Sequence, residues 1–286
     1  MNVNKTNSQT VLVTGCSSGI GYCVAHGLKL RGYHVIATAR AISDVERLRH
    51  EGLDTLQLDL SDSQSIKRAV SEVLTLAQGR LYALFNNAAY GQPGAIEDLR
   101  REVLREQFET NVFGTVELTN LLIPTLREQG RGRIIQNSSV LGFVSLPLRG
   151  AYNASKYALE GISDTLRLEL KGSGISVSLI EPGPIESHFR ANAFAMFKKN
   201  IEVQGSPHRD LYLQTENRLT QDGPAVPFTL PPTAVLKRVI HALESPRPKT
   251  RYFVTFPTYF FALLKRLLTD KALDRILAMT SKPAKK

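Results

Sequence analysis

The stretch from residue 10 to residue 32 reads TVLVTGCSSGIGYCVAHGLKLRG and decides the fold. Residues 10–14 (TVLVT) are a short run of apolar and β-branched side chains, which predicts a buried β-strand. A loop with three glycines follows, and residues 22–31 then carry apolar side chains at helical spacing as far as Gly32. A strand, a glycine-rich loop and a helix in this order predict a phosphate-binding site, with a plain glycine-rich turn as the alternative.

Each glycine of the loop has a physical reason to be there. Gly15 permits the tight turn, Gly19 lets backbone N–H groups approach a pyrophosphate, and Gly21 lets the helix pack close to the strand. The start of the helix adds unpaired N–H groups and about half a positive charge. The spacing G-x-x-x-G-x-G differs from the commoner G-x-G-x-x-G.

The end of the next predicted strand, residues 34–38, indicates which dinucleotide would bind. In this arrangement an acid at the strand end accepts hydrogen bonds from a ribose 2′-hydroxyl, whereas an arginine pairs with a 2′-phosphate. The chain has Ala39 and then Arg40, with no acid before Asp44. We therefore expect NADP(H) to be preferred over NAD(H), unless Arg40 is only a solvated loop residue.

Strands and helices alternate along the rest of the chain. The predicted strands after residue 38 are 55–58, 81–85, 132–137, 175–180 and 251–255, and the predicted helices are 44–51, 61–78, 99–126 and 152–171. This alternation predicts an α/β doubly wound (Rossmann) fold, with a mostly parallel seven-stranded sheet and helices on both faces. Ligands of such sheets bind at the carboxyl ends of the strands, where the motifs of this chain lie.

A second motif supplies candidate chemistry. Tyr152 and Lys156 are four residues apart, so they share one face of a helix, and Ser139 ends a predicted strand thirteen residues earlier. A free tyrosine has a pKa near ~10, and a neighbouring cation lowers it toward the range of a general acid/base. Ser139 would hold a carbonyl or hydroxyl oxygen, with Ser138 as the alternative. A partly exposed helix face is the simpler explanation of the spacing alone.

Three asparagines accompany these motifs. The strand at 81–85 leads into Asn86-Asn87-Ala88, whose backbone and amide groups suit a flat ligand. Asn111 lies inside the helical pattern of residues 99–126 and needs hydrogen-bond partners there. Its amide is either satisfied within the helix core or kinks the helix and holds water beside the lysine.

Composition narrows the class of protein. The chain has 286 residues, a net charge of +10 and two cysteines. No apolar run reaches the roughly 20 residues of a membrane span, and the polar first ten residues are no secretory signal. We expect a cytoplasmic, reducing location. Residues 231–286 hold twelve Lys/Arg against three acids, so +9 of the net +10 lies there. Basic patches with interleaved aromatics are missing elsewhere, so nucleic acid is only a minor alternative.

Substrate information is expected after the sixth strand. Residues 188–232 contain apolar side chains that either line a pocket or lid, together with three residues after Ser139, or simply pack the domain. The set is Phe189, Phe194, Met196, Phe197, Tyr212 and Phe228, with Leu141, Phe143 and Val144. Residues 259–279 show helical apolar spacing with basic residues between. This helix caps the domain, pairs with another subunit or lies on an anionic membrane surface; capping or pairing is the simpler explanation.

With these residues in place, the chain resembles the short-chain dehydrogenase/reductase family over about residues 10–190. The motifs that carry the resemblance are T-G-x-x-x-G-x-G at 14–21, N-N-A at 86–88, Asn111, Ser139, Y-x-x-x-K at 152–156 and P-G at 182–183, all in order. The segment after the sixth strand is most similar to the retinol- and steroid-dehydrogenase-like branch, including bacterial NADP-dependent aldehyde reductases.

The resemblance implies a role for each matching residue. Tyr152 would be the acid/base, Lys156 would lower its pKa and bind the nicotinamide ribose, Ser139 would orient the substrate oxygen, and Asn111 would support a proton-relay water. Asp59 would hold the adenine amino group. The implied cofactor-binding residues are Gly15, Ser17, Ser18, Gly19, Ile20, Gly21, Arg40, Asp59, Leu60, Asn87, Ala88, Tyr152, Lys156, Pro182, Gly183, Ile185 and Ser187. No metal is implied.

The chain departs from the family pattern at three places. Ala89 replaces the usual glycine after N-N-A, Ser187 replaces the usual threonine but keeps a hydroxyl, and no basic residue precedes Gly19. The NADP preference therefore depends mainly on Arg40.

We accordingly expect an oxidoreductase, a carbonyl reductase that transfers hydride between NADP(H) and a lipophilic aldehyde or a retinoid- or steroid-like ketone. The alternatives are a catalytically silent NADP(H)-binding regulator and a sugar-nucleotide epimerase or dehydratase; the latter usually needs a G-x-x-G-x-x-G loop, which is absent. We expect one domain over residues 1–286, with a core at about 10–190, a lid at about 188–232 and a basic helical extension at about 256–286. A homodimer or homotetramer is the usual assembly of the family.

Overall fold

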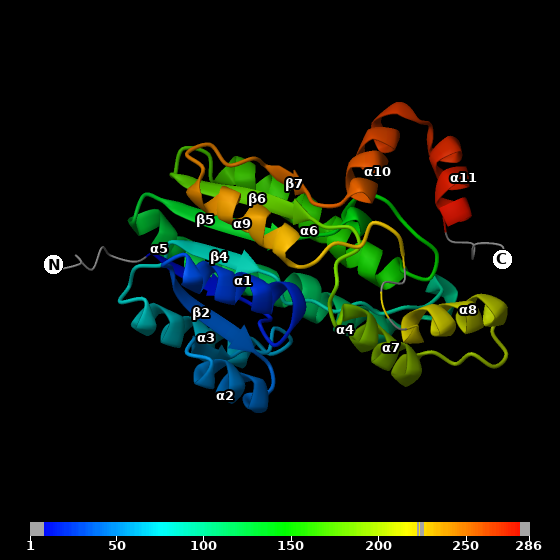
Figure 1. Ribbon diagram of the computed structural model, residues 1–286, viewed down its shortest axis with the longest axis horizontal. Helices are drawn as coiled ribbons and strands as arrows, with labels where there is room; N and C mark the ends of the chain where they lie inside the picture. Colours follow the sequence, from blue (N-terminus) through cyan, green and yellow to red (C-terminus); the bar gives the residue numbers. More distant parts are fainter. Residues whose placement is uncertain (1–8, 222, 224–225, 281–286) are drawn as a thin grey trace.

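This computed structural model describes residues 9–221, 223 and 226–280 (Figure 1). Its centre is a seven-stranded sheet in the order β3-β2-β1-β4-β5-β6-β7, and every neighbouring pair is parallel. The strands are β1 (Thr10–Val13), β2 (His34–Ala39), β3 (Asp54–Gln57), β4 (Ala83–Asn86), β5 (Gly132–Asn137), β6 (Ile175–Glu181) and β7 (Arg251–Phe253). The predicted doubly wound sheet is confirmed, and it is parallel throughout.

Helices cover both faces of the sheet (Figure 1). They are α1 (Gly19–Leu30), α2 (Ile42–His50), α3 (Ser63–Leu76), α4 (Arg101–Phe108), α5 (Gly114–Glu128), α6 (Gly150–Glu169), α7 (Phe189–Asn200), α8 (Arg209–Thr220), α9 (Thr233–Glu244), α10 (Phe256–Leu267) and α11 (Asp270–Thr280). α1, α2 and α9 pack on one face, and α3 and α5 pack on the other.

Alternation along the strands builds two cores, one on each face. On β1, Val11 and Val13 belong to the core under α1 and α9, whereas Leu12 belongs to the core under α3 and α5. Successive side chains of a strand point to opposite faces, so a strand covered on both sides is apolar throughout. The chain passes to opposite edges of the sheet on either side of the β1–β4 pair, which creates the crevice where such sheets bind ligands.

The structure corrects three predicted helices. α1 begins at Gly19 rather than residue 22, so the last two loop glycines belong to its first turn. The predicted helix 99–126 is α4 and α5 joined by a π-helix at Glu109–Phe113, which contains Asn111.

The predicted C-terminal helix 259–279 is the pair α10 and α11. Leu268 has an extended backbone, which ends α10. The backbone oxygen of Thr269 accepts the first hydrogen bonds of α11, and threonine is favoured at the start of a helix, so the segment forms two helices and not one. The end of the predicted extension, residues 281–286, lies outside the described residues. Within the described part of the chain, no helix combines the length and apolar character that crossing a membrane requires.

Candidate active site

Three of the four predicted catalytic side chains meet at the carboxyl end of β5. Ser139 follows this strand, and Tyr152 and Lys156 lie one turn apart on α6. The Tyr152 hydroxyl shares a side-chain hydrogen bond with Ser139. The Lys156 ammonium nitrogen lies 5.7 Å from the centre of the Tyr152 ring. All three are buried, so phenol, hydroxyl and ammonium form one water-poor cluster.

The acidity of Tyr152 differs from the sequence expectation. Burial raises its pKa to about 12, and the hydrogen bond with Ser139 lowers it only in part. The expectation that Lys156 makes the phenol more acidic overall is wrong for the protein by itself. The free energy needed to remove the phenolate from water exceeds the stabilisation that the nearby groups provide.

Lys156 has two partners that the sequence analysis did not name. Its ammonium donates to the backbone oxygen of Asn137 at 2.7 Å. Burial lowers the pKa of Lys156 to about 8, and the carboxylate of Glu160, one helical turn further on, raises it. The four-residue spacing from Lys156 to Glu160 was a visible signal for this second partner.

Asn111 lies beside the cluster, and its side-chain hydrogen bonds go to Tyr90 and Ser155 rather than to Lys156. Its amide nitrogen donates to the Tyr90 backbone oxygen at 2.9 Å and to the Ser155 hydroxyl at 3.1 Å. Its side-chain oxygen accepts from the Tyr90 backbone N–H at 3.1 Å. The amide is therefore satisfied within the protein, at the point where the helix widens to π geometry.

The glycine loop and the N-N-A segment fit together closely. A Cβ on Gly15 would lie 2.8 Å from Cα of Ala88, and one on Gly21 would lie 2.1 Å from the Gly15 backbone oxygen. The Asn87 amide donates to the backbone oxygens of Thr14 at 2.9 Å and Gly15 at 3.1 Å. Only glycine leaves room for these backbones, and Gly15 also has a positive φ of 70°.

The start of α1 suits an anion. No side chain caps this helix, although Ser18 is at the N-cap, and its first turn has no acid. The N–H groups of the first turn are therefore unpaired donors at the positive end of the helix. Ser17 and Ile20 flank these donors in the same segment. The residues present thus fit the pyrophosphate of a dinucleotide.

Two cations lie near the ribose end of this crevice. Arg40 follows β2, is exposed and forms no ion pair with the residues that the structure describes. Arg47, which the sequence analysis missed, donates to the Ser17 backbone oxygen at 2.7 Å while pairing with Asp44 and Glu51. The i−3 and i+4 spacing of its acids was visible in the sequence. Arg40 is the freer of the two cations.

Asp59 and Leu60 follow β3 at the same edge. The Asp59 carboxylate accepts from the Ser61 backbone N–H at 2.9 Å and from the Ser61 hydroxyl at 2.7 Å. Leu60 is buried, and a Cβ on Gly114 would lie 1.8 Å from its backbone oxygen. Asp59 is thus oriented at the edge, whereas the Leu60 side chain belongs to the core.

The loop after β6 closes the other side of the crevice. Pro182 accepts a backbone hydrogen bond from Val140 at 2.8 Å, which ties this loop to the segment after Ser139. A Cβ on Gly19 would lie 2.8 Å from Cβ of Ser187, so this loop also touches the glycine loop. Ile185 pairs with Leu230, the end of the predicted lid. The loop after β6 is therefore in contact with both the segment after Ser139 and the glycine loop.

A buried charge cluster lies behind Lys156. Arg251 of β7 contacts Glu160 at 2.9 Å, Asp164 at 2.8 Å and Glu181 at 3.0 Å. Burial, followed by the charge of Glu160, raises the pKa of Glu181 to about 9. The buried pair Glu160 and Glu181 thus has raised pKa values, whereas the partly exposed Asp164, hydrogen-bonded by the same guanidinium, has a lowered one.

The predicted lid contains helices α7 and α8, and its aromatics divide into two groups. The Phe189 ring packs edge-on against Tyr152, with 5.2 Å between ring centres. Phe197 and Tyr212 are fully buried against each other, and Val144 is buried with α11. Phe189 therefore borders the active site, whereas the other three pack the protein.

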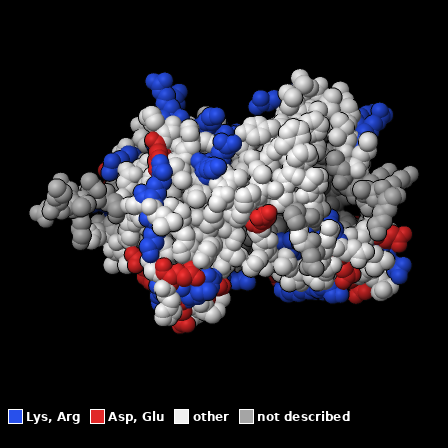
Figure 2. Space-filling model, viewed as in Figure 1, with Lys and Arg blue, Asp and Glu red and all other residues white. Residues whose placement is uncertain are grey.

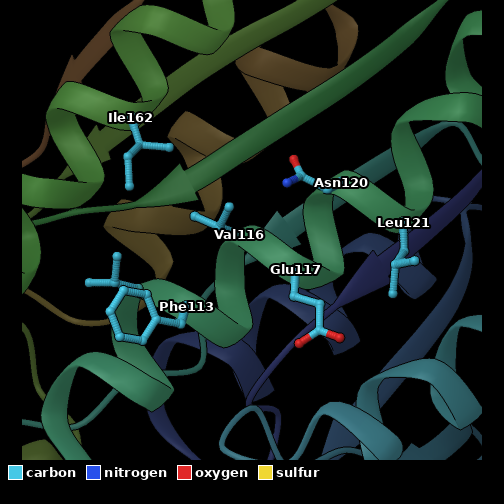
Figure 3. Close-up of a pocket in the computed structure, with 7 residues that line it drawn as sticks. Phe113, Val116, Glu117, Asn120, Leu121 and Ile162 are labelled. Carbon is cyan, nitrogen blue, oxygen red and sulfur yellow. The ribbon is translucent and has the colours of Figure 1, made fainter. Parts of the chain in front are cut away.

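A separate shallow hollow of about 400 Å³ lies on the outer side of α5 and α6 (Figure 3). It is lined by Val112, Phe113, Val116, Glu117, Asn120, Leu121 and Ile162. None of the four predicted catalytic residues lines it. Its apolar surface is a feature of the molecule's exterior and not of the crevice.

A doubly wound sheet with a glycine-lined helix start and a Ser–Tyr–Lys cluster at the strand ends defines a nicotinamide-dependent class of oxidoreductase. Comparison with known proteins agrees, because the short chain dehydrogenase family model matches residues 9–197. The chain belongs to the short-chain dehydrogenase/reductase family, as its motifs predicted.

The relatives extend over most of the chain. It is 44% identical to an uncharacterized oxidoreductase, YbbO, of Escherichia coli K12 over 96% of this chain and 95% of that one. It is 32% identical to an NADPH-dependent 3-dehydrocapnine reductase of Ornithobacterium rhinotracheale, covering 93% and 94%. It is 33% identical to human retinol dehydrogenase 8, covering 85% and 80%. The chain is an oxidoreductase of the retinol/steroid-like branch.

Proposed function

We propose that the protein is an NADPH-dependent carbonyl reductase acting on lipophilic aldehydes or ketones. The observation that carries the proposal is the buried phenol of Tyr152, which shares a hydrogen bond with Ser139 beside the Lys156 ammonium. A silent nucleotide-binding regulator would not need this arrangement. An epimerase or dehydratase is disfavoured by the family match.

The chain's own groups would hold the cofactor along the crevice. The first turn of α1 and the backbones around Gly15 and Gly19 would bind the pyrophosphate, and Asp59 the adenine. Lys156 would bind the nicotinamide ribose, and the loop from Pro182 to Ser187 the carboxamide. When bound, the nicotinamide supplies the hydride.

Tyr152 would deliver the proton in the reducing direction. With a pKa raised to about 12, the phenol is fully protonated at neutral pH, so it is ready to donate. A carbonyl oxygen placed between Ser139 and Tyr152 would accept both hydrogen bonds and take the proton as its negative charge develops. The protonated phenol is the form that carbonyl reduction requires.

Arg40 supports the choice of NADPH. Its guanidinium follows β2, at the place where a 2′-phosphate would lie, and it is free of other ion pairs in the described part of the chain. A charge-assisted hydrogen bond to phosphate is stronger than a neutral one. The 32% identical relative named as NADPH-dependent agrees with this choice.

The side chains near Tyr152 support an apolar substrate. Phe189 lies against the catalytic ring and is partly exposed, so it offers an aromatic surface to a substrate. Similarity to a retinol dehydrogenase points to the same class of molecule.

We also propose that the apolar hollow on α5 and α6 is where copies of the chain pair (Figure 3).

Turnover tests the proposal directly. NADPH oxidation is followed against aldehydes of increasing chain length, retinal and a steroid ketone. We expect consumption with NADPH well above that with NADH, and kcat/KM rising with chain length. NADPH binding without consumption across the panel would instead support the regulator, and NADH preference would contradict the role of Arg40.

A further inference from the structure

Helix α10 turns an apolar face to solvent. Its exposed side chains recur at helical spacing, and the lid residue Phe228 extends the face, with its ring centre 5.0 Å from that of Phe256. We define the aromatic face as Phe228, Phe256, Tyr259, Phe260, Leu263 and Leu267, each at least 40% exposed. Proteins rarely leave such a continuous apolar surface in water without an interaction partner.

The exposed charges of α10 and α11 are mainly basic. Four exposed cations, Lys265, Arg266, Lys271 and Arg275, accompany two exposed acids, Asp270 and Asp274. Figure 2 shows a broad uncharged surface over α10, with basic groups at both of its edges. An apolar face with a basic border fits the headgroup region of an anionic bilayer.

Capping accounts for the other side of this helix pair only. Phe261 and Leu264 of α10 pack with Leu273 and Leu277 of α11 against the segment that follows Ser139. That packing leaves the aromatic face uncovered. A second copy of the chain is a poorer occupant, because a two-fold contact would bring together four exposed cations of α10 and α11 from each copy with only two exposed acids, Asp270 and Asp274, to pair with them.

The aromatic face also borders the crevice. A Cβ on Gly183 would lie 2.1 Å from the Thr255 hydroxyl, so α10 starts on the loop that follows β6. Phe228 is two residues from Leu230, which pairs with Ile185 of that loop. The face and the mouth of the crevice therefore share a side of the molecule.

We propose that the protein attaches peripherally to anionic membranes, with the aromatic face of α10 seated among the lipid headgroups and the cations of α10 and α11 on the lipid phosphates. The mouth of the crevice then opens at the lipid surface, where lipophilic carbonyl compounds dissolve. That last consequence rests on the proposed function, whereas the membrane attachment does not.

Vesicle flotation of the full chain tests the attachment. With equal parts phosphatidylglycerol and phosphatidylcholine we expect binding that weakens with salt, and with phosphatidylcholine alone we expect little. Leu267→Glu should reduce the bound-to-free ratio by about tenfold or more. The substitution removes a leucine that the bilayer would bury and adds a negative charge that the anionic lipid repels. Leu30→Glu is the matched control, since both leucines end a twelve-residue helix and are at least 70% exposed.

The basic border is tested separately. Arg266→Gln with Lys271→Gln should lower binding by about fivefold per charge, and Lys67→Gln with Arg68→Gln on α3 should not change it beyond the effect of net charge. Equal binding to both vesicle types, or equal loss with the two glutamate variants, would overturn the proposal.

Sedimentation velocity without lipid tests whether a second copy of the chain occupies the aromatic face instead. If Leu267→Glu dissociates an oligomer and the wild type does not float with anionic vesicles, the face belongs to a second copy and the proposal is wrong. NADPH oxidation with a short, water-soluble aldehyde is measured on the same samples. A protein that turns over without floating would refute the attachment alone.

Discussion

Arg251→Met should destabilise the fold far more than an ordinary surface ion pair would. Among the residues that the structure describes, Arg251 is the cation that pairs with Glu160 and Glu181, two buried carboxyl groups, and it also pairs with Asp164. Methionine keeps much of the packing volume and removes the charge. Breaking a buried ionic cluster by removing one partner typically costs about 3–5 kcal/mol. We expect a loss of this size in the free energy of unfolding near neutral pH.

The pH dependence identifies the cause. Hydrogen bonding by Arg251 lowers the pKa of Asp164, so this pair stabilises the native state above the ordinary carboxyl pKa of 3.8. Burial raises the pKa of Glu160, which can take up a proton in the variant as the pH falls. The deficit of Arg251→Met should therefore be largest near about pH 7.5 and smaller by about 1 kcal/mol or more near about pH 5.

Urea unfolding at both pH values provides the measurement. The control is Arg167→Met, because Arg167 contacts the same partly exposed Asp164 carboxylate but pairs with neither of the buried glutamates. An exposed pair is worth about 0–1 kcal/mol, so this variant should remain close to wild type. Equal losses in the two variants, or a loss with Arg251→Met that does not change with pH, would refute the buried-cluster argument.

Three further predictions concern the crevice. Gly21→Ala should abolish measurable cofactor binding in fluorescence titration, because its Cβ would lie 2.1 Å from a backbone oxygen. The control is Gly161→Ala, on an open helix surface. It should keep cofactor binding and raise the free energy of unfolding by about 0.5–1 kcal/mol. Arg40→Ser should lower the NADPH-to-NADH ratio of kcat/KM by about 10–100-fold, and an unchanged ratio would remove the basis for NADP preference. Asn111→Ala should lower the melting temperature, measured by calorimetry, because the Tyr90 backbone N–H loses its side-chain acceptor and the Tyr90 oxygen keeps Gln107 but loses its second donor.

Wild-type stability, measured by urea unfolding, should itself fall as the pH rises from 4.5 to about 9. The pKa of Glu181, about 9 in the fold, lies above its ordinary value of 4.5, so the native state keeps a proton that the unfolded chain releases. Stability contributed in this way is complete below the ordinary value and is lost as the pH rises through about 9.

Local patterns predicted the sheet well. Residues 132–137 were predicted as a strand and form β5 with the same bounds, with the β-branched pair Ile134 and Ile135 buried at its centre. The start of α1 was placed too late, since glycine has a poor helix propensity and the backbone packing that requires Gly19 and Gly21 is tertiary. The break before α11 was missed because apolar spacing continues across Thr269.

The candidate site was predictable where residue spacing determines it. The interval from Ser139 to Tyr152 and Lys156 follows from one strand end and one helix, and the structure brings these residues together. The cluster around Arg251 could not be predicted, because Arg251 lies 91 residues from Glu160 and joins it only through the order of strands. The pKa of Tyr152 was also out of reach, since its burial depends on α7 packing over the ring.

The most direct test of the account is single-turnover hydride transfer from NADPH in Tyr152→Phe. The variant keeps the ring that packs on Phe189 and loses only the hydroxyl that shares a hydrogen bond with Ser139. We predict NADPH affinity within about threefold of wild type and hydride transfer to an aldehyde slowed by about 10²–10⁴-fold. Transfer at a rate within a few-fold of wild type would contradict the claim that the phenol of Tyr152 supplies the proton.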